Sequence, residues 1–395
     1  MRAGSFQSQP GGYQAFMPAP LPPDPPIQVD LPLVQLLSKA DQAVARLDGV
    51  ALTLPNPNLF VATYVRQEAV LSSQIEGTQS TLDDVLAYEL DGAGRALPQD
   101  VEEVVNYVRA MNYGLQRLET LPLSLRLIRE IHAELLHNAR GGEKRPGEFR
   151  VDQNWIGEGR VSITQATFVP PPPADMLQAL GNLESYLHEE NGLPALIHCA
   201  IAHAQFETIH PFLDGNGRVG RLLVTFLLCQ RQVLHQPLLY MSAFLKRHRA
   251  EYYDRLMAVR LSGDWEAWIA FFLRGALATA NEATQTAHRI VLLQEEHRRM
   301  VQEADLGLQS LRLLDILFQR PLVTVRSIGE HLGVSYGTAN RLVEAFRSLG
   351  LLNEATGRQR NRAFRYSPFL GLFPEATAPV TAAAPTQSTE HPALP

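Results

Sequence analysis

One stretch of the chain, residues 210–221, gathers side chains that could do chemistry on phosphates. It holds one histidine, one aspartate, a Gly-Asn-Gly turn and two arginines. Glycine lets the backbone approach a phosphate, an Asn amide can donate to one, and an arginine can bind two of its oxygens at once. A carboxylate can hold a magnesium ion that also contacts phosphates, and an imidazole can accept a proton at neutral pH. These groups together indicate a site for a nucleoside triphosphate.

The segments on either side of this stretch are apolar and predict helices at 193–208 and 222–233. The glycine-rich turn between them opens the second helix. The free N–H groups and the positive end of that helix dipole therefore face the turn. This placement favours an anion bound at the turn.

Residues 210–221 read His-Pro-Phe-Leu-Asp-Gly-Asn-Gly-Arg-Val-Gly-Arg. They match H-P-F-x-D-G-N-G-R-x-x-R, the signature of the Fic family, at every specified position. No Gly-Lys-Ser/Thr follows the glycines, so the stretch is not a Walker loop. The chain thus resembles Fic proteins over roughly residues 31–280. The resemblance implies an all-α Fic fold with a short β-hairpin flap, and transfer of AMP from ATP to a Tyr, Ser or Thr hydroxyl of a protein.

The resemblance also implies a role for each position of the motif. His210 is the general base that takes the proton from the target hydroxyl, and Asp214 holds the Mg²⁺ ion that accompanies ATP. Phe212 is a core anchor for the loop. The positions implied to contact the nucleotide are Asp214, Gly215, Asn216, Gly217, Arg218, Arg221, Tyr252 and Tyr253. The two tyrosines are placed near adenine by the resemblance alone, and aromatic residues on a helix are equally typical of a core.

A second motif lies at the end of a helix predicted over 59–73. Ser72 and Glu76 are four residues apart, so they share a helix face, and Gly77 follows as a helix stop. The hexad Ser-Ser-Gln-Ile-Glu-Gly resembles the S-x-x-x-E-G/N inhibitory helix of one class of Fic proteins. The resemblance implies that Glu76 occupies the γ-phosphate site and pairs with Arg221. The alternative is a solvent-facing glutamate before a helix end.

Residues 151–169 alternate in polarity and contain strand-forming residues around a Glu158-Gly159 turn, which predicts a β-hairpin. In Fic proteins a hairpin here, the flap, covers the active site and pairs with a segment of the target protein. We therefore expect an unknown protein target to dock near residues 155–170. The alternative is a hairpin with no role beyond the fold.

The segment 305–370 has the pattern of a winged helix-turn-helix. It holds nine arginines and five acidic residues, a net charge of +4 against −10 for the rest of the chain. Arg358, Arg360 and Arg362 fall in the predicted wing, where phosphate contacts would be made. DNA binding and a role as an interaction or dimerisation module remain equal alternatives for this segment.

The whole chain is expected to divide into several parts, as 395 residues suggest two to three domains. The expected parts are a Pro-rich mobile arm at 1–30, an N-terminal helical region carrying the inhibitory helix at 31–120, a Fic core at 121–280, a linker helix at 281–304, a winged helix-turn-helix at 305–370 and a disordered tail at 371–395. The arm and the tail contain too few apolar residues to fold alone.

Composition narrows the class of protein further. The net charge of −6 argues against a general polyanion binder, and no apolar run is long enough to span a bilayer. We find no signal peptide pattern. Cys199 and Cys229 both lie in apolar helical patterns, so no disulfide framework is indicated. We expect a cytoplasmic protein without a membrane partner, and a homodimer remains open.

Other functions compatible with these residues remain as alternatives. Glu76 could position water for removal of AMP from a modified protein. Phosphotransfer as in the Doc branch is disfavoured, because that branch has Ala and Lys where Gly215 and Gly217 stand. A DNA-binding regulator whose core senses a nucleotide belongs to a different class. A toxin held by a separate antitoxin is disfavoured because Glu76 already supplies an inhibitor in the same chain.

Overall fold

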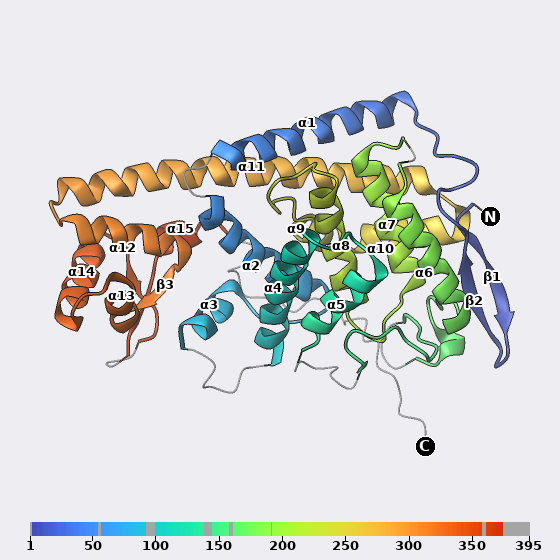
Figure 1. Cartoon of the computed structure of the whole chain (residues 1–395), viewed down its shortest axis with the longest axis horizontal. Helices are drawn as coiled ribbons and strands as arrows, with labels where there is room; N and C mark the ends of the chain where they lie inside the picture. Colours follow the sequence, from blue (N-terminus) through green and yellow to red (C-terminus); the bar gives the residue numbers. More distant parts are fainter. Residues whose placement is uncertain are drawn as a thin grey trace, which may run out of the picture.

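The structure is a computed structural model and is mostly helical (Figure 1). It describes residues 2–53, 57–91, 99–137, 144–157, 161–190, 192–357 and 361–373. A helical core, a small antiparallel hairpin and a C-terminal helix-turn-helix are all present, so the expected fold class is confirmed. Within the described residues, no helix has the length and apolar character needed to cross a bilayer.

Helices α1 to α11 form the larger part of the molecule. They are α1 (Leu31–Thr53), α2 (Pro57–Ile75), α3 (Leu82–Asp91), α4 (Gln99–Leu118), α5 (Leu125–Leu135), α6 (Pro173–His188), α7 (Ala195–Ile209), α8 (Asn216–Gln230), α9 (Ser242–Arg247), α10 (Arg249–Ser262) and α11 (Trp265–Glu303). Helix α7 is apolar on all sides and buried from Leu196 to Ile209, as a central helix must be. Helix α8 packs against α7 and begins six residues earlier than expected, inside the motif itself.

Helix α11 is a single helix of 39 residues, and the expected linker helix at 281–304 is its second half. Helix α1 lies along it, although the two are far apart in the sequence (Figure 1). Small buried residues of α11, such as Ala276, Ala280 and Ala283, allow helices to approach it closely. Helix α11 packs on α1 of the core and is followed directly by α12 of the C-terminal module, so it joins the two parts.

The N-terminal segment differs from the mobile arm that we expected. Strands β1 (Gly4–Gln9) and β2 (Tyr13–Pro18) pair as an antiparallel hairpin against the core. Phe16 is completely buried, and its N–H donates to the carbonyl of Val169 (2.9 Å). Arg2 forms an ion pair with Glu266 at the start of α11 (2.9 Å). The segment is ordered because the core supplies the apolar surface that the segment lacks by itself.

The expected flap hairpin at 151–169 contains little regular pairing in the part that the structure describes. Ile156 and Phe168 form one antiparallel bridge, and a 3₁₀ helix, η2 (Ile163–Gln165), follows the turn region. The predicted turn residues Glu158 and Gly159 lie outside the described residues. Strand β2 contacts the flap, because the N–H of Phe16 donates to the carbonyl of Val169. The N-terminal hairpin therefore supports the flap.

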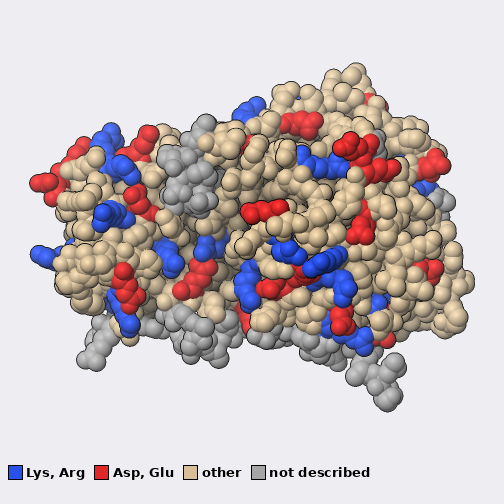
Figure 2. Space-filling view, viewed as in Figure 1, with Lys and Arg blue, Asp and Glu red and all other residues tan. Residues whose placement is uncertain are grey.

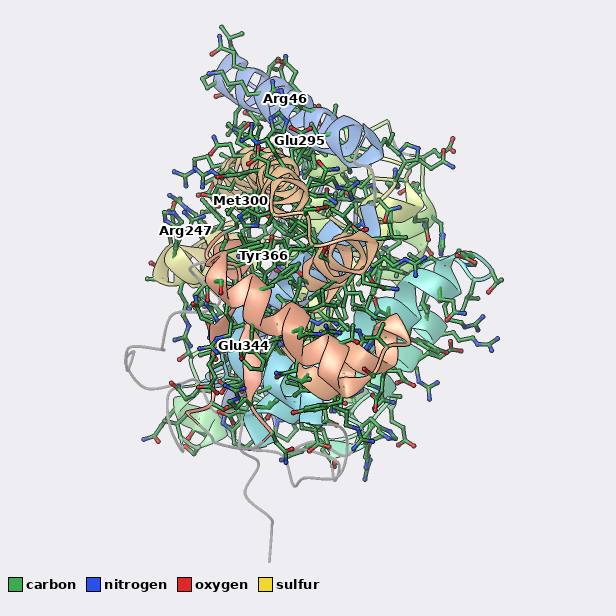
Figure 3. All side chains as sticks on the ribbon, turned by 90° about the vertical axis from the view of Figure 1, so that its left-hand side faces the viewer. Arg46, Arg247, Glu295, Met300, Glu344 and Tyr366 are labelled. Atoms are coloured by element: carbon green, nitrogen blue, oxygen red, sulfur yellow. The ribbon has the colours of Figure 1, made fainter. Side chains whose placement is uncertain are left out.

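The C-terminal module has the expected winged helix-turn-helix arrangement. It contains α12 (Leu308–Gln319), β3 (Leu322–Thr324), α13 (Val325–Leu332), α14 (Tyr336–Ser348), β4 (Asn353–Glu354), β5 (Ala363–Arg365) and α15 (Ser367–Leu370), with antiparallel strand order β3-β5-β4. Thr324 begins α13 with a capping box and Ser335 caps α14. Helix α14 lies at the outer end of the molecule, with Glu344 on it (Figure 3).

The module is attached to the helical core by specific contacts. Arg365 of β5 forms an ion pair with Asp83 of α3 (3.1 Å), and α12 packs on α2. Phe373 is buried and contacts the ring of Tyr64 on α2. Phe373 belongs to the segment that we expected to be a disordered tail, whose residues 374–395 lie outside the described part.

Candidate active site

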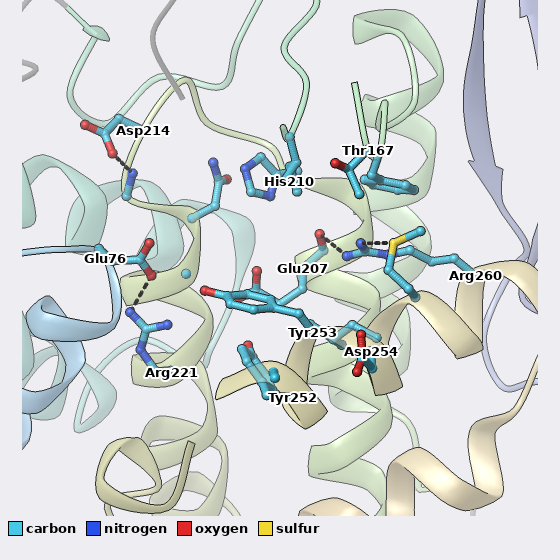
Figure 4. A pocket seen from close by; sticks show the side chains of 18 residues that line it. Glu76, Thr167, Glu207, His210, Asp214, Arg221, Tyr252, Tyr253, Asp254 and Arg260 are labelled. Atoms are coloured by element: carbon cyan, nitrogen blue, oxygen red, sulfur yellow. Dashed lines mark hydrogen bonds and ion pairs between the residues drawn. The ribbon is translucent and has the colours of Figure 1, made fainter. Parts of the chain in front are cut away.

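A cavity of about 350 Å³ lies between α7, α8, α10, the flap and the end of α2 (Figure 4). Of the residues singled out in the sequence, its wall contains Glu76, His210, Asp214, Gly215, Asn216, Gly217, Arg221, Tyr252 and Tyr253. Of the catalytic, nucleotide-binding and inhibitory residues predicted from the sequence, Ser72 and Arg218 do not line it. The fold therefore brings the end of α2 to the motif loop, about 140 residues away along the chain.

The motif loop has a backbone that few sequences could adopt. His210 ends α7 in the left-handed conformation (φ 50°, ψ 61°), and Gly215 adopts it again just before α8 (φ 78°). A left-handed histidine is uncommon and requires support from its surroundings. Asn216 supplies part of that support, because its Oδ1 accepts from the N–H of Phe212 and its Nδ2 donates to the carbonyl of Phe212, both at 2.8 Å. The Asn216 amide thus braces the loop, whereas we had considered it as a phosphate donor.

His132 of α5 also holds the loop, and the sequence analysis did not identify it. Its ring stacks on Phe212, with ring centroids 3.7 Å apart. Its Nδ1 accepts from the N–H of Gly147 (2.9 Å), so its Nε2 carries the proton that it donates to the carbonyl of Asp214 (3.1 Å). Burial lowers the pKa of His132 to about 3, so the ring is neutral and keeps this tautomer.

Arg150 and Asn154, which precede the flap bridge, bind the same loop from the other side. Arg150 Nε donates to the carbonyl of His210 (3.0 Å), and Asn154 Nδ2 donates to the carbonyl of Phe212 (2.8 Å). Both residues are buried. No local pattern marks them in the sequence, because their partners are about 60 residues away.

The catalytic candidate His210 faces the cavity as a neutral ring. It is buried, and its Nδ1 has no hydrogen-bond partner among the described residues. Burial, together with the charges of Arg150 and Arg260, lowers the pKa of His210 to about 3. An imidazole in that state can accept a proton, and a bound anion would raise its pKa.

Glu76 and Arg221 form an ion pair at one end of the cavity (Figure 4). Arg221 Nη2 donates to Glu76 Oε1 (2.7 Å) and to the carbonyl of Ser72 (3.0 Å), and its Nε donates to Ser72 Oγ (2.7 Å). Arg221 is buried, and the Glu76 side chain is 32% exposed. Burial by itself would raise the pKa of Glu76, but the charge and hydrogen bond of Arg221 lower it below its ordinary value. The pair is therefore ionised at neutral pH.

The other motif arginine, Arg218, does not reach into the cavity as we expected. Its Nη1 donates to Glu103 of α4 (2.9 Å), and its Nη2 donates to Asp214 Oδ1 (3.4 Å). It is 3% exposed, and these two carboxylates hold its guanidinium outside the cavity wall. In this state Arg218 fastens α8 to α4. Glu103 is a further partner that sequence spacing did not reveal.

The two tyrosines of α10 occupy different environments. Tyr252 is buried, and its hydroxyl bonds His203 Nε2 (2.9 Å), while His203 Nδ1 bonds the carbonyl of Gly220 (2.8 Å). Its hydroxyl therefore connects α10 to α7 and α8. Tyr253 lies beside the cavity and packs against Tyr252, with ring centroids 5.0 Å apart. Both tyrosines line the cavity, but Tyr252 is buried whereas Tyr253 is partly exposed.

Asp214 is the carboxylate that could hold a metal ion. It is partly exposed at the cavity, and its Oδ1 accepts from the N–H of Gly215. Among the described residues, there is no cluster of three His, Cys, Asp or Glu side chains that could hold a metal ion. One carboxylate with free coordination positions suits Mg²⁺, which commonly takes the rest of its ligands from phosphates and water.

Comparison with known families agrees with this geometry. The profile described as Fic/DOC family N-terminal matches residues 34–116, and the Fic/DOC family profile matches residues 122–228, which contain the motif loop. Residues 34–116 and 122–228 therefore match the Fic family. An HTH DNA binding domain profile matches residues 311–365, within the C-terminal module.

Curated relatives of this chain carry the name Protein adenylyltransferase Fic. The protein from Drosophila grimshawi is 30% identical over 203 residues, which is 50% of this chain and 38% of that protein. The protein from Aedes aegypti is 31% identical over 182 residues, which is 44% of this chain and 32% of that protein. The chain therefore spans less than two fifths of the length of these relatives.

Solved structures share the fold. A Fic family protein from Desulfovibrio desulfuricans G20 aligns with a TM-score of 0.57 and 20% identity, covering 86% of this chain and 97% of that one. A Fic domain containing signaling protein from Bacteroides thetaiotaomicron aligns with a TM-score of 0.50 and 18% identity, covering 63% and 97%. At these identities the likeness concerns the fold alone.

Proposed function

We propose that this chain transfers AMP from ATP to a Tyr, Ser or Thr hydroxyl of a protein, and that Glu76 inhibits the transfer. The support comes from the match to the Fic family, from the relatives named as protein adenylyltransferases, and from the arrangement of the cavity. The observation that carries the proposal is the ion pair of Glu76 with Arg221 beside the motif loop.

The phosphates of ATP bind at the N-terminus of α8 in this proposal. The first N–H groups of a helix lack partners within it, and the helix dipole favours negative charge there. Gly217 presents no side chain at this point, so phosphate oxygens can reach the backbone. Arg221 pairs with the γ-phosphate in place of Glu76. Arg218 contacts phosphate if it leaves Glu103.

His210 acts as the general base in the proposed reaction. The target hydroxyl gives its proton to the His210 ring, and its oxygen attacks the α-phosphorus in line with the departing pyrophosphate. The loop contacts of His132, Arg150 and Asn216 keep the base in place, and accurate placement supplies much of the rate.

Mg²⁺ fits at Asp214, and when bound it would neutralise charge on the phosphates. The carboxylate of Asp214 is held by the N–H of Gly215, which orients it toward the cavity. Arg218 Nη2 donates to the same carboxylate (3.4 Å).

The flap is the proposed docking site of the target protein. The flap segment that contains Phe168 and Val169 is already bonded to β2, because the N–H of Phe16 donates to the carbonyl of Val169. The opposite segment, with Trp155 and Ile156, is joined to it by the bridge between Ile156 and Phe168. A target segment can therefore add as a strand at the 155–157 side.

The test is incubation of the purified chain with ATP labelled on the α-phosphate or on the γ-phosphate. Retention of the α-label on protein, with an added mass of AMP on a hydroxyl residue, supports AMP transfer. Retention of only the γ-label would point to phosphotransfer, and loss of AMP from a premodified protein would point to the reverse reaction.

The C-terminal module is proposed to bind DNA through α14. Tyr336 and Arg341 of that helix are exposed. The helix itself lies at one end of the molecule (Figure 1). On the face shown in Figure 2, however, basic and acidic side chains alternate over the module, and Arg347 and Arg362 both pair with Glu344. Binding would then depend on replacing these ion pairs with phosphate contacts.

A further inference from the structure

Glu207 is a second carboxyl group in the cavity, and the proposed mechanism does not use it. It lies in the last turn of α7 (Ala195–Ile209), three residues before His210, which ends the helix. Glu207 is 7% exposed, and its Oε1 has no hydrogen-bond partner among the described residues. Glu207 lines the cavity, and Figure 4 shows the residue between His210 and Tyr253. An unpaired buried acceptor of this kind requires an explanation.

The surrounding backbone makes room for this carboxyl. A Cβ atom on Gly220 would lie 2.2 Å from Glu207 Oε1, so any other residue there would displace it. Gly217 stands in the same relation to Glu76 Oε1, also at 2.2 Å. The two glycines are one turn apart on α8. The same helix face therefore accommodates two carboxyl groups, of which only Glu76 is paired with Arg221.

The protein supplies little to stabilise a charge on Glu207. Burial raises the pKa of Glu207 to about 7, and the nearby charge of Glu76 raises it as well, while Arg221 and Arg260 act in the opposite direction. Arg260 donates to the main-chain carbonyl of Glu207 (3.0 Å). A ligand that brings a hydrogen-bond donor would supply the missing partner.

The position of Glu207 indicates which part of a nucleotide it meets. The phosphate-binding groups, which are the N-terminus of α8 and Arg221, lie toward Glu76. On the side of Glu207 away from Glu76, Figure 4 shows Thr167 and Arg260. Arg260 contacts Phe168 and Met257, and these two residues and Leu256 give the wall an apolar part that suits a base. Glu207 therefore lies between the Glu76–Arg221 pair and the apolar part of the wall, where a nucleoside would meet it.

Building on the proposed function, we propose that Glu207 recognises the nucleoside: its carboxylate accepts a hydrogen bond from a donor on the ribose or on the base of ATP. The ribose hydroxyls and the exocyclic amine of adenine share this chemistry. Glu207 is then a binding residue that selects nucleotides with a donor at that place.

The experiment measures binding by calorimetry in the Glu76→Gly/His210→Ala background, which opens the site and stops turnover. The probes are ATP, 2′-deoxy-ATP, 3′-deoxy-ATP, ITP, which lacks the amine, and inorganic tripolyphosphate. One analogue should bind roughly 10- to 100-fold more weakly than ATP, because a hydrogen bond to a charged group is removed. That analogue identifies the donor as a ribose hydroxyl or the amine.

Adding Glu207→Ala should lower the affinity for ATP by a similar factor, so that ATP and that analogue bind equally well. The affinity for tripolyphosphate should not change. Glu207→Gln has the same shape beside Gly220 and keeps a neutral acceptor, so it should lose part of the preference for ATP over that analogue. This variant replaces the alanine variant if the latter does not fold. Glu295→Ala, a change on the surface of α11, is the control (Figure 3).

Two results would overturn the proposal. One is an ATP affinity that Glu207→Ala leaves unchanged. The other is an analogue that binds more weakly than ATP by the same factor whether or not Glu207 is present. Tighter tripolyphosphate binding in Glu207→Ala would also overturn it, since Glu207 would then face the phosphates. Failure of the background variant to bind ATP at all would contradict the proposed function itself, and is thereby distinguished from a failure of Glu207 alone.

Discussion

Gly217 leaves room for Glu76, because a Cβ atom on residue 217 would lie only 2.2 Å from Glu76 Oε1. The carboxylate rests against the backbone at the start of α8, where the free N–H groups of the helix favour an anion. Under the proposed function the γ-phosphate needs the same space and the same partner, Arg221.

Glu76→Gly should raise AMP transfer, including self-modification, by on the order of 100-fold. The change frees Arg221 for the γ-phosphate, so ATP can bind with the alignment that in-line attack requires. The measurement is incorporation of α-labelled AMP into protein over time. Glu76→Asp should release the activity in part, since its shorter side chain reaches less far.

The matched control for this change is Glu76→Gly combined with Arg221→Ala, which should lose the gain because the freed partner is absent. Equal or lower transfer by folded Glu76→Gly would contradict inhibition by Glu76. It would favour the alternative in which Glu76 positions water for removal of AMP.

His210→Ala should abolish transfer in the Glu76→Gly background and leave ATP binding largely intact. A positioned general base typically supplies ~10²–10⁴-fold in rate. Single-turnover transfer and calorimetric ATP binding measure the two effects separately. Near-normal turnover in the variant would mean that another group takes the proton.

His132→Ala should lower kcat by roughly 10- to 100-fold while changing the KM for ATP less. The variant lacks the stack on Phe212 and the bond to the Asp214 carbonyl, so the motif loop is less accurately placed. His132→Gln keeps a donor for that carbonyl and should recover part of the rate. The exposed His235 provides a control in His235→Ala. A change in KM alone would argue that His132 does not position the catalytic loop.

The stability of the protein should depend on pH through Glu68 of α2. Burial raises the pKa of Glu68 to about 7 from 4.5, although Ser242, Tyr107 and Arg221 oppose the shift. A carboxyl whose pKa is raised on folding stabilises the fold fully below its ordinary pKa and loses that contribution as the pH rises through about 7.

Unfolding temperatures of wild type and Glu68→Gln between pH 5 and pH 8 measure this effect. Relative to the variant, the wild type should lose roughly 1–3 kcal/mol of stability across that range. Glu295→Gln should follow the wild type. Parallel curves for wild type and Glu68→Gln would show that Glu68 does not titrate in this range.

DNA binding by the C-terminal module should weaken steeply with salt. Replacing Arg358, Arg360 and Arg362 together should flatten the slope of log affinity against log salt by about 0.9 for each DNA phosphate that the variant no longer neutralises. Arg358 and Arg360 lie outside the described residues, and Arg362 lies 3.6 Å from Glu344. A labelled duplex that is not retained even at low salt would assign the module to protein interaction.

The sequence by itself identified the features that depend on neighbouring residues. Residues 210–221 indicate their chemistry because a phosphate-binding turn needs its glycines, carboxylate and arginine within a few residues. The i, i+4 spacing places Ser72 and Glu76 on one helix face, and both now contact Arg221. Apolar periodicity predicted helices at 59–73 and 193–208, and their ends lie within two residues of those of α2 and α7. Periodicity succeeds there because it reflects the face that a helix buries.

The tertiary structure decided what depends on distant residues. It placed Glu103 on Arg218, His132 on Phe212 and β2 on Val169, pairings that no local spacing encodes. The N-terminal segment resembled a mobile arm because its composition cannot form a core alone, yet Phe16 is buried by surface from elsewhere in the chain. Glu207 looked like an ordinary helix residue until packing enclosed it. Burial and charge pairing are properties of the folded assembly of elements, and therefore only the fold could decide them.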